Sequence, residues 1–157
     1  MKKSAYFGSR WWTAWPTVAE LEPYFLGPAG KRWFFETGND SGSLSAEGAY
    51  NTEHFAPGQG RIDIRLRMWG DPDLGVLLIY SKWGGGFKET FTSKGDLTRL
   101  GEHVRTMHND PMPVGLYIPY DRAFAAVKDF IETDGELPRA IEWIANDQLP
   151  DNTFPPP

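Results

Sequence analysis

The sequence contains no cysteine. A disulfide framework, a cysteine-ligated zinc site and a thiol nucleophile are therefore excluded. Its 157 residues, of which 40% are hydrophobic, are nevertheless enough to build a packed core. We expect one domain over residues 1–157, and its stability must come from packing alone.

Long apolar runs are also missing, because no stretch approaches the length of a membrane-spanning helix. Residues 1–4 are followed by Tyr6, Gly8 and Arg10 rather than by the apolar segment of a secretory signal. We therefore expect a cytoplasmic protein without a membrane partner.

Histidine is scarce, and the catalytic patterns are thin. His54, His103 and His108 are the only histidines, and the five-residue step between the last two does not suit a helical zinc pair. The glycines of 84–86 are not followed by the Lys-Ser/Thr pair of a phosphate loop, so they predict a turn. No Gly-x-Ser-x-Gly nucleophile elbow occurs. These patterns predict neither an enzyme nor a cofactor or metal site.

The net charge of −5 is concentrated at one end of the chain. From Pro119 onward there are eight acidic residues against three basic ones, whereas the first 118 residues are balanced. An acidic end argues against nucleic acid as a direct ligand and suits a basic protein partner. The alternative interpretation is a solvated face that keeps the protein soluble.

The strongest secondary-structure signal lies between residues 61 and 93. Residues 61–68 alternate, with Ile62, Ile64, Leu66 and Met68 on one face. Residues 76–80 are apolar on both faces, as expected of a strand covered on both sides. After the glycine turn the alternation resumes. We predict an antiparallel meander of strands at 61–68, 76–82 and 87–92.

A C-terminal helix is predicted over residues 120–133, where Tyr120, Phe124, Val127 and Ile131 form an apolar stripe. Gly135 and Pro138 provide its end. The expected fold class is α+β, with this helix packed on one face of the sheet through Phe124, Val127 and Ile131. A short N-terminal helix is predicted at 18–22, limited by Pro23.

The remaining segments carry weaker patterns, and residues 49–60 fit no element. The expected elements are a strand at 31–36, a loop at 38–43, a helical turn after Leu97 with a strand around Val104, extended chain at 114–118, a closing strand at 140–144 and an extended tail at 151–157.

Tryptophan is concentrated near the N-terminus, at Trp11, Trp12 and Trp15. Exposed aromatic rings can stack on the flat apolar faces of sugars, although large aromatic side chains are more often buried. A carbohydrate- or ligand-binding module that uses these residues and Trp83 is therefore an alternative function. A third is a small hydrolase using carboxylates such as Glu89 and Glu142, although nothing in the sequence places these two together.

Two motifs resemble those of a known family. One begins at Ile118-Pro119 and ends at Trp143, and the other begins at Gly85-Gly86-Phe87. The first continues through Ala123, Ala126, Phe130, Thr133, Gly135, Leu137-Pro138 and Ile141, and the second through Phe91, Ser93 and Gly95.

In order and spacing these residues resemble the Immunity protein 1 family of bacterial polymorphic toxin systems. The resemblance covers a core at residues 61–145 and leaves 1–60 as a tryptophan-rich extension. Asp134 is an extra residue in the usual Thr-Gly step.

The resemblance implies a small α+β protein that neutralises a cognate toxin inside the cell that makes both, as in competition between bacteria. The toxin is most often a nucleic-acid deaminase. The family is not enzymatic and uses no cofactor. Because such a toxin must present a basic groove to its substrate, an acidic inhibitor would complement it.

Candidate contact residues follow from turn chemistry and charge. They fall in the turn after the first strand of the meander, around the glycine turn, and at the acidic C-terminal end. They are Asp71, Asp73, Lys82, Trp83, Phe87, Glu142, Asp147 and Asp151. An aromatic anchor surrounded by acids suits a basic partner, although each of these residues could also be merely solvated.

Overall fold

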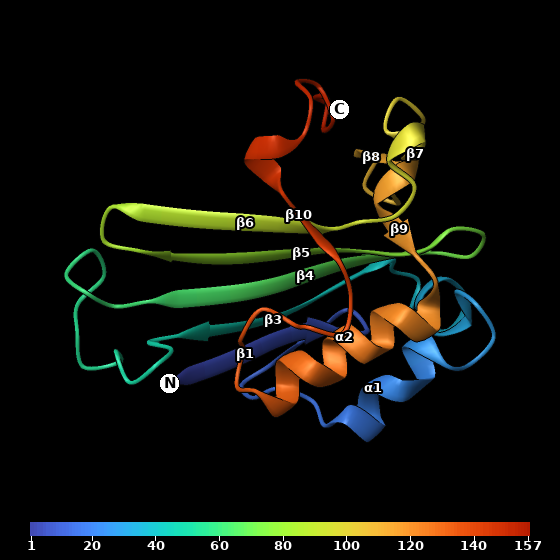
Figure 1. The fold of residues 1–157 in the computed structure, drawn as a ribbon. Helices are drawn as coiled ribbons and strands as arrows, with labels where there is room; N and C mark the ends of the chain where they lie inside the picture. Colours follow the sequence, from blue (N-terminus) through green and yellow to red (C-terminus); the bar gives the residue numbers. More distant parts are fainter.

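The computed structural model describes residues 1–157, with the side chain of Phe35 excepted. Its centre is an antiparallel sheet of eight strands, shown in Figure 1. Seven strands follow one another across the sheet, and β9 (Tyr117–Ile118) pairs with β5 off this path. The order is β10 (Trp143–Ala145), β6 (Phe87–Ser93), β5 (Gly75–Gly84), β4 (Asp63–Asp71), β3 (Ser41–Glu47), β1 (Lys2–Phe7) and β2 (Arg10–Trp12).

The predicted meander is confirmed in β4, β5 and β6. Leu66 of β4 lies opposite Tyr80 of β5, which lies opposite Phe91 of β6. Side chains alternate between the two faces of a strand, so these three share one face. The adjacent β5 residues Leu77 and Leu78 are both fully buried but belong to different hydrophobic clusters. The sheet is therefore covered on both faces at β5, as its apolar sequence predicts.

Two helices, α1 (Val18–Phe25) and α2 (Tyr120–Glu132), cover the same face of the sheet (Figure 1). The α+β class and the C-terminal helix are thus confirmed. The centre of the buried stripe differs from the prediction: Ala123, Ala126, Val127 and Phe130 are buried, whereas Phe124 and Ile131 are only partly so. The small alanines let the helix lie close to the sheet, which leaves Phe124 at the side, where its ring meets Phe25 of α1 at 5.6 Å.

Helix α1 begins at a capping box, because Thr17 accepts from the Glu20 amide while the Glu20 carboxylate accepts from the Thr17 amide. The prediction that Pro23 limits this helix is wrong, since it continues to Phe25. Tyr24 and Phe25 are buried against Trp33, with ring centroids 5.3 Å apart in both pairs. This packing stabilises the last helical turn, which follows Pro23.

The predicted strand at 31–36 is also wrong: residues Lys31–Thr37 form the π-helix η1. Gly30 and Gly38, at its two ends, adopt left-handed backbone conformations that favour glycine. Within the helix, Arg32 and Glu36 form an ion pair at 2.8 Å. The aromatic residues that suggested a strand instead place Trp33, fully buried, in the core between the sheet and the helices.

The predicted loop at 38–43 is wrong from Ser41 onward, because β3 begins there. Its inward residues are Gly42, Leu44 and Ala46, and all are buried. The Phe7 ring occupies the space that a side chain at Gly42 would need. Glycine and serine therefore signal close packing between strands here rather than a turn.

A second, smaller layer covers part of the opposite face of the sheet. Its core consists of Leu77, Ile79, Met112, Leu116 and Tyr117. It is built from η2 (Leu97–Arg99), β7 (His103–Arg105), β8 (Pro111–Pro113), η3 (Val114–Leu116) and β9. The predicted helical turn and following strand are confirmed as η2 and β7.

The extended chain predicted at 114–118 is only partly present. Residues 114–116 form a 3-10 turn. The backbone of 96–100 passes so close to Gly115 that a side chain there would collide with it. The predicted closing strand begins only at Trp143 and runs to Ala145. It is followed by η4 (Asn146–Gln148) and by a turn at residues 151–154, so the extended tail predicted at 151–157 is wrong for 151–154.

Strand β6 has a partly free edge. β10 pairs with it at Phe91–Ser93, and in the part of the chain that the structure describes no strand pairs with Lys88, Glu89 or Thr90 on that side. No helix among the described residues is long and apolar enough to cross a membrane.

Candidate functional site

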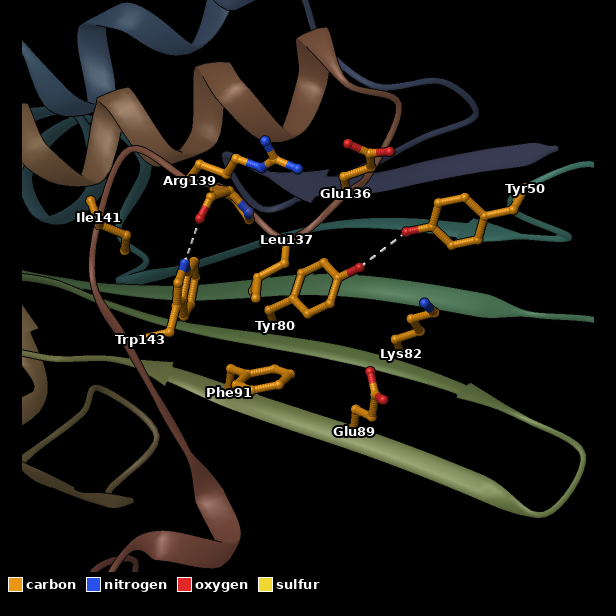
Figure 2. A pocket seen from close by; sticks show the side chains of 11 residues that line it. Tyr50, Tyr80, Lys82, Glu89, Phe91, Glu136, Leu137, Arg139, Ile141 and Trp143 are labelled. Carbon is orange, nitrogen blue, oxygen red and sulfur yellow. Dashed lines mark hydrogen bonds between the residues drawn. The ribbon is translucent and has the colours of Figure 1, made fainter.

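A wide hollow lies between the chain that leaves α2 and the exposed ends of β5 and β6 (Figure 2). We call it the groove, and its volume is about 680 Å³. It is open to solvent and lined by both aromatic and charged side chains. These are Tyr50, Tyr80, Lys82, Glu89, Phe91, Glu136, Leu137, Pro138, Arg139, Ile141 and Trp143.

The inner wall of the groove is aromatic. Tyr80 and Phe91 face each other across β5 and β6, and the rings of Tyr80 and Trp143 lie edge to face at 6.5 Å. The indole Nε1 of Trp143 donates to the Pro138 carbonyl at 2.7 Å, which fixes this ring against the segment after α2. Figure 2 shows these side chains converging from the sheet and from the C-terminal segment. Such a wall offers apolar contact at low entropic cost.

A tyrosine pair closes one end of the groove. The Tyr80 hydroxyl donates to the Gly135 carbonyl at 2.9 Å, and the Tyr50 hydroxyl donates to the same carbonyl at 3.1 Å. The two hydroxyls are 3.2 Å apart (Figure 2). Burial, and then the Tyr50 hydrogen bond, raise the pKa of Tyr80, so this phenol stays neutral and structural. Three distant segments of the chain are joined here.

Gly135 makes this junction possible. It has a φ of +94°, and the Ile64 side chain occupies the position that a β-carbon would take. Tyr50 also adopts a left-handed conformation, with a φ of 57°. Sequence reasoning left residues 49–60 unassigned and so missed Tyr50. The only local signal was an aromatic residue within a turn-rich segment.

Charged groups surround the aromatic wall. Lys82 and Glu89 are opposite each other across β5 and β6, and the Lys82 ammonium lies 4.9 Å from the centre of the Tyr50 ring. The segment 132–151, of which residues 136–143 line the other wall, carries six acidic residues and only one basic residue, Arg139. One of those acids, Asp134, pairs with Lys3 at 2.7 Å. On this side Glu136 and Arg139 line the groove itself, while Glu142 and Asp147 add negative charge next to it.

A second hollow of about 440 Å³ continues the groove along β6 and shares Glu89 and Phe91 with it. Asp147 lines this hollow together with Lys88 and Asn146. The Thr92 hydroxyl donates to the Asn146 side chain at 2.6 Å, which holds η4 against β6. The two hollows form one continuous surface.

Four of the predicted contact residues lie on or beside this surface. Lys82 lines the groove and Asp147 lines the second hollow. Glu142 is exposed beside Trp143, and its carbonyl accepts from the Lys94 amide at 3.1 Å. Phe87, which is 40% exposed, shares a strand face with Glu89 and Phe91 at the end of the hairpin.

The other predicted residues lie elsewhere. Trp83 follows Lys82 in β5 and therefore points to the opposite face, where it lies 5.8 Å from the Arg65 guanidinium. Asp71 and Asp73 are at the other end of β5, about 25 to 30 Å from the glycine turn. The Asp71 carboxylate accepts from the amides of Asp73 and Leu74, so it is used within its own turn. Asp151 lies in the turn after η4.

The three N-terminal tryptophans do not form one platform. Trp15 packs on Phe130 at 4.9 Å and donates to the Ser45 carbonyl, and Trp12 is stacked against Arg10 at 3.7 Å. Only Trp11 is widely exposed, at 77%. This arrangement does not favour a sugar-stacking surface built on all three.

The groove contains no recognisable catalytic set. Glu89 lines it, but Glu142 does not. Within the described residues, no three histidine or carboxylate side chains are grouped so that they could hold a metal ion. What the surface can supply is apolar contact, hydrogen bonds and charged groups of both signs.

Comparison with known families settles what kind of protein this is. The family described as Immunity protein Imm1 matches residues 44–145, well over half of the chain. The chain belongs to the Imm1 family. No curated protein matches it. The matched region runs from β3 to the end of β10, so both walls of the groove lie within it.

Membership in Imm1 makes this chain an immunity protein of a toxin system, with a toxin protein as its partner. It also favours a binding role over a catalytic one. Residues 1–43, which supply β1, β2, α1 and η1, lie outside the match but are built into the same sheet and core.

Proposed function

We propose that this Imm1 protein inhibits a cognate toxin domain that acts on nucleic acid, most consistently a deaminase, in the cytoplasm of the cell that makes both. The contact surface that we assign to this task is the groove with its continuation along β6. The observation that carries the assignment is an aromatic-lined groove inside the family match, with Glu136 on its wall, Glu142 beside it and Asp147 in its continuation.

The charge of this surface supports a nucleic-acid-acting target. An enzyme that binds a polyanion needs a basic substrate groove, and an acidic rim on the inhibitor complements that groove and steers association. The Phe91 and Trp143 rings provide the apolar centre that tight interfaces need. Lys82 and Arg139 also line the groove. These two cations can bind carboxylates of the partner and so fix its orientation.

The test uses the toxic domain encoded next to this gene. We expect the purified protein to abolish deamination of a DNA or RNA substrate at a stoichiometric ratio. Failure of the wild-type protein to inhibit would overturn the proposed function. Inhibition of a toxin that cleaves strands, and does not convert bases, would keep the immunity role and remove the deaminase.

The surface is tested by charge reversal. The double variant Glu142→Lys/Asp147→Lys should associate roughly tenfold more slowly at low salt, and the difference should shrink as salt is added. The variant Glu22→Lys/Asp121→Lys makes the same change in net charge on the helices and should associate like the wild type. Equal slowing in both variants would mean that net charge alone matters and that the groove is not the contact.

The apolar part of the surface is tested at Phe87. Phe87→Ala should accelerate dissociation of the complex by roughly tenfold, because aromatic anchors act mainly on the off-rate. Surface plasmon resonance separates the two rates. An unchanged off-rate in a variant that melts like the wild type would exclude the hairpin end from the interface.

A further inference from the structure

Part of the sheet face opposite the helices has no covering layer. The second layer packs on Leu77 and Ile79, but two residues of β4 that point to this face, Arg65 and Arg67, are exposed. A shallow hollow of about 220 Å³ lies here. We call this surface the open face, and its side chains are Ser4, Tyr6, Trp11, Ser43, Ser45, Glu47, Asp63, Arg65, Arg67 and Trp83. Its two carboxylates, Glu47 and Asp63, both lie within 4 Å of the Arg61 guanidinium.

Two like charges stand side by side on the open face. Arg65 and Arg67 are successive outward residues of β4, and in the described part of the chain neither lies within 4 Å of a carboxylate oxygen. By contrast, Arg61, which lies just before β4, forms an ion pair with Asp63 at 2.9 Å. Partial desolvation by the neighbouring side chains, and then the charge of Arg65, lower the pKa of Arg67, although its side chain stays exposed. An anionic partner would relieve this repulsion.

The arginines are held among aromatic rings. The Arg67 guanidinium lies 5.5 Å from the centre of the Trp69 ring, and Arg65 also donates through Nε to the Ser45 hydroxyl at 3.2 Å. Trp11 lies against Tyr6 at 4.9 Å and presents most of its ring to solvent. Tryptophan, tyrosine and arginine are the residues that most often dominate the energy of protein interfaces.

We propose that the open face is a second contact surface for the toxin partner and binds an acidic segment of that protein. The carboxylates would be held by Arg65 and Arg67, and the apolar part of the segment would pack on Trp11 and Trp83. This inference rests on the proposed function. It adds that the partner presents two surfaces of opposite sign, a basic one to the groove and an acidic one here.

The β5–β6 hairpin explains how one partner can reach both surfaces. Lys82 lines the groove, whereas the next residue, Trp83, belongs to the open face. A partner that encloses the hairpin end therefore meets the groove on one side and the open face on the other.

The experiment measures the affinity of the full chain for the toxic domain encoded next to this gene. Arg65→Glu/Arg67→Glu should weaken Kd by roughly 30-fold or more, and Trp11→Ala by about fivefold to tenfold. Arg65→Lys/Arg67→Lys should fall between, because lysine keeps the charge but cannot bind a carboxylate with two parallel hydrogen bonds. The variant Arg122→Glu/Lys128→Glu places the same charge change on α2 and should bind like the wild type.

The outcomes separate this inference from the proposed function. Tight wild-type binding that is indifferent to the arginine variants would overturn the second surface alone. No wild-type binding would overturn both. A fluorescein-labelled single-stranded oligonucleotide provides the other arm: if it binds the wild type and is lost from Arg65→Glu/Arg67→Glu, the open face belongs to nucleic acid and the inference fails. Melting curves must match the wild type, as expected for two exposed side chains.

Discussion

The two faces of β4 carry opposite chemistry in alternate residues. Ile64, Leu66 and Met68 are fully buried beneath the helices, whereas Arg65 and Arg67, interleaved with them, are exposed. Full burial of an apolar side chain contributes about 1.5 to 3 kcal/mol, while exposed charges contribute little to stability. One face of the strand therefore stabilises the fold, and the other is free to be selected for contact with a partner.

The largest expected effect comes from placing a charge on the covered side. Val127 of α2 is fully buried against the sheet, so Val127→Asp would leave an unpaired carboxylate in the core. The cost should be on the order of 3 kcal/mol or more. Chemical denaturation measures it, and Lys128→Asp, at the exposed next position, is the matched control. A Val127→Asp protein that melts like the wild type would show that the helix is placed wrongly.

Within β5, Leu77 points into the second layer and Leu78 into the core beneath the helices, and both are fully buried. Truncation of either to alanine should cost about 2 to 4 kcal/mol of unfolding free energy. Similar losses would show that the small second layer is packed as tightly as the helix layer. A loss at Leu77 typical of a surface position, below about 0.5 kcal/mol, would contradict the second core.

A smaller effect on stability is expected at Tyr80, which lines the groove on the face of the sheet that the helices cover. Tyr80→Phe removes one hydrogen bond to the Gly135 carbonyl and leaves that of Tyr50 in place. The expected loss is about 1 kcal/mol. Tyr50→Phe, at a more exposed position, should cost less. If the order is reversed, the Tyr50 loop rather than Tyr80 holds the chain after α2.

The same tyrosine gives a pH dependence. Its pKa in the folded protein is raised above the ordinary value of 10.0, so the folded state keeps a proton that the unfolded chain loses. The stability linked to Tyr80 is therefore complete below about pH 10 and declines as the pH rises further. Tyr117 and Tyr120, whose pKa values burial also raises, act in the same direction. Denaturation at rising alkaline pH should show this decline, and it should be shallower in Tyr80→Phe.

Periodicity predicted the parts of the fold that have one clear exposed and one clear buried side. The meander and α2 follow from the spacing of Ile64, Leu66 and Val127 along the chain. Strand β3 was not predicted because its inward residues are small. Gly42 indicates a turn when only the sequence is considered, whereas in the structure the Phe7 ring packs over it. The π-helix was missed because an aromatic run also fits a strand. Gly30 and Gly38 indicate the two ends of this helix only once their left-handed backbone conformation is known.

The groove was less predictable than the fold. It joins residues near 50, 80, 90 and 140, and no local pattern states that these segments meet. Lys82 and Asp147 were identified from charge, whereas Tyr50, Phe91 and Glu136 were not. The separation of Lys82 from Trp83 could have been predicted, because strand alternation alone puts neighbours on opposite faces.

The partly free edge of β6 bears on how the protein behaves at high concentration. An unpaired strand edge is a template for another strand and so a site of self-association. Antiparallel pairing of two molecules centred on Glu89 would set two carboxylates directly opposite each other, and parallel pairing in register would stack Lys88 on Lys88. The edge thus resists aggregation of the protein with itself, while its backbone groups at Lys88 and Thr90 stay available to a strand of different sequence.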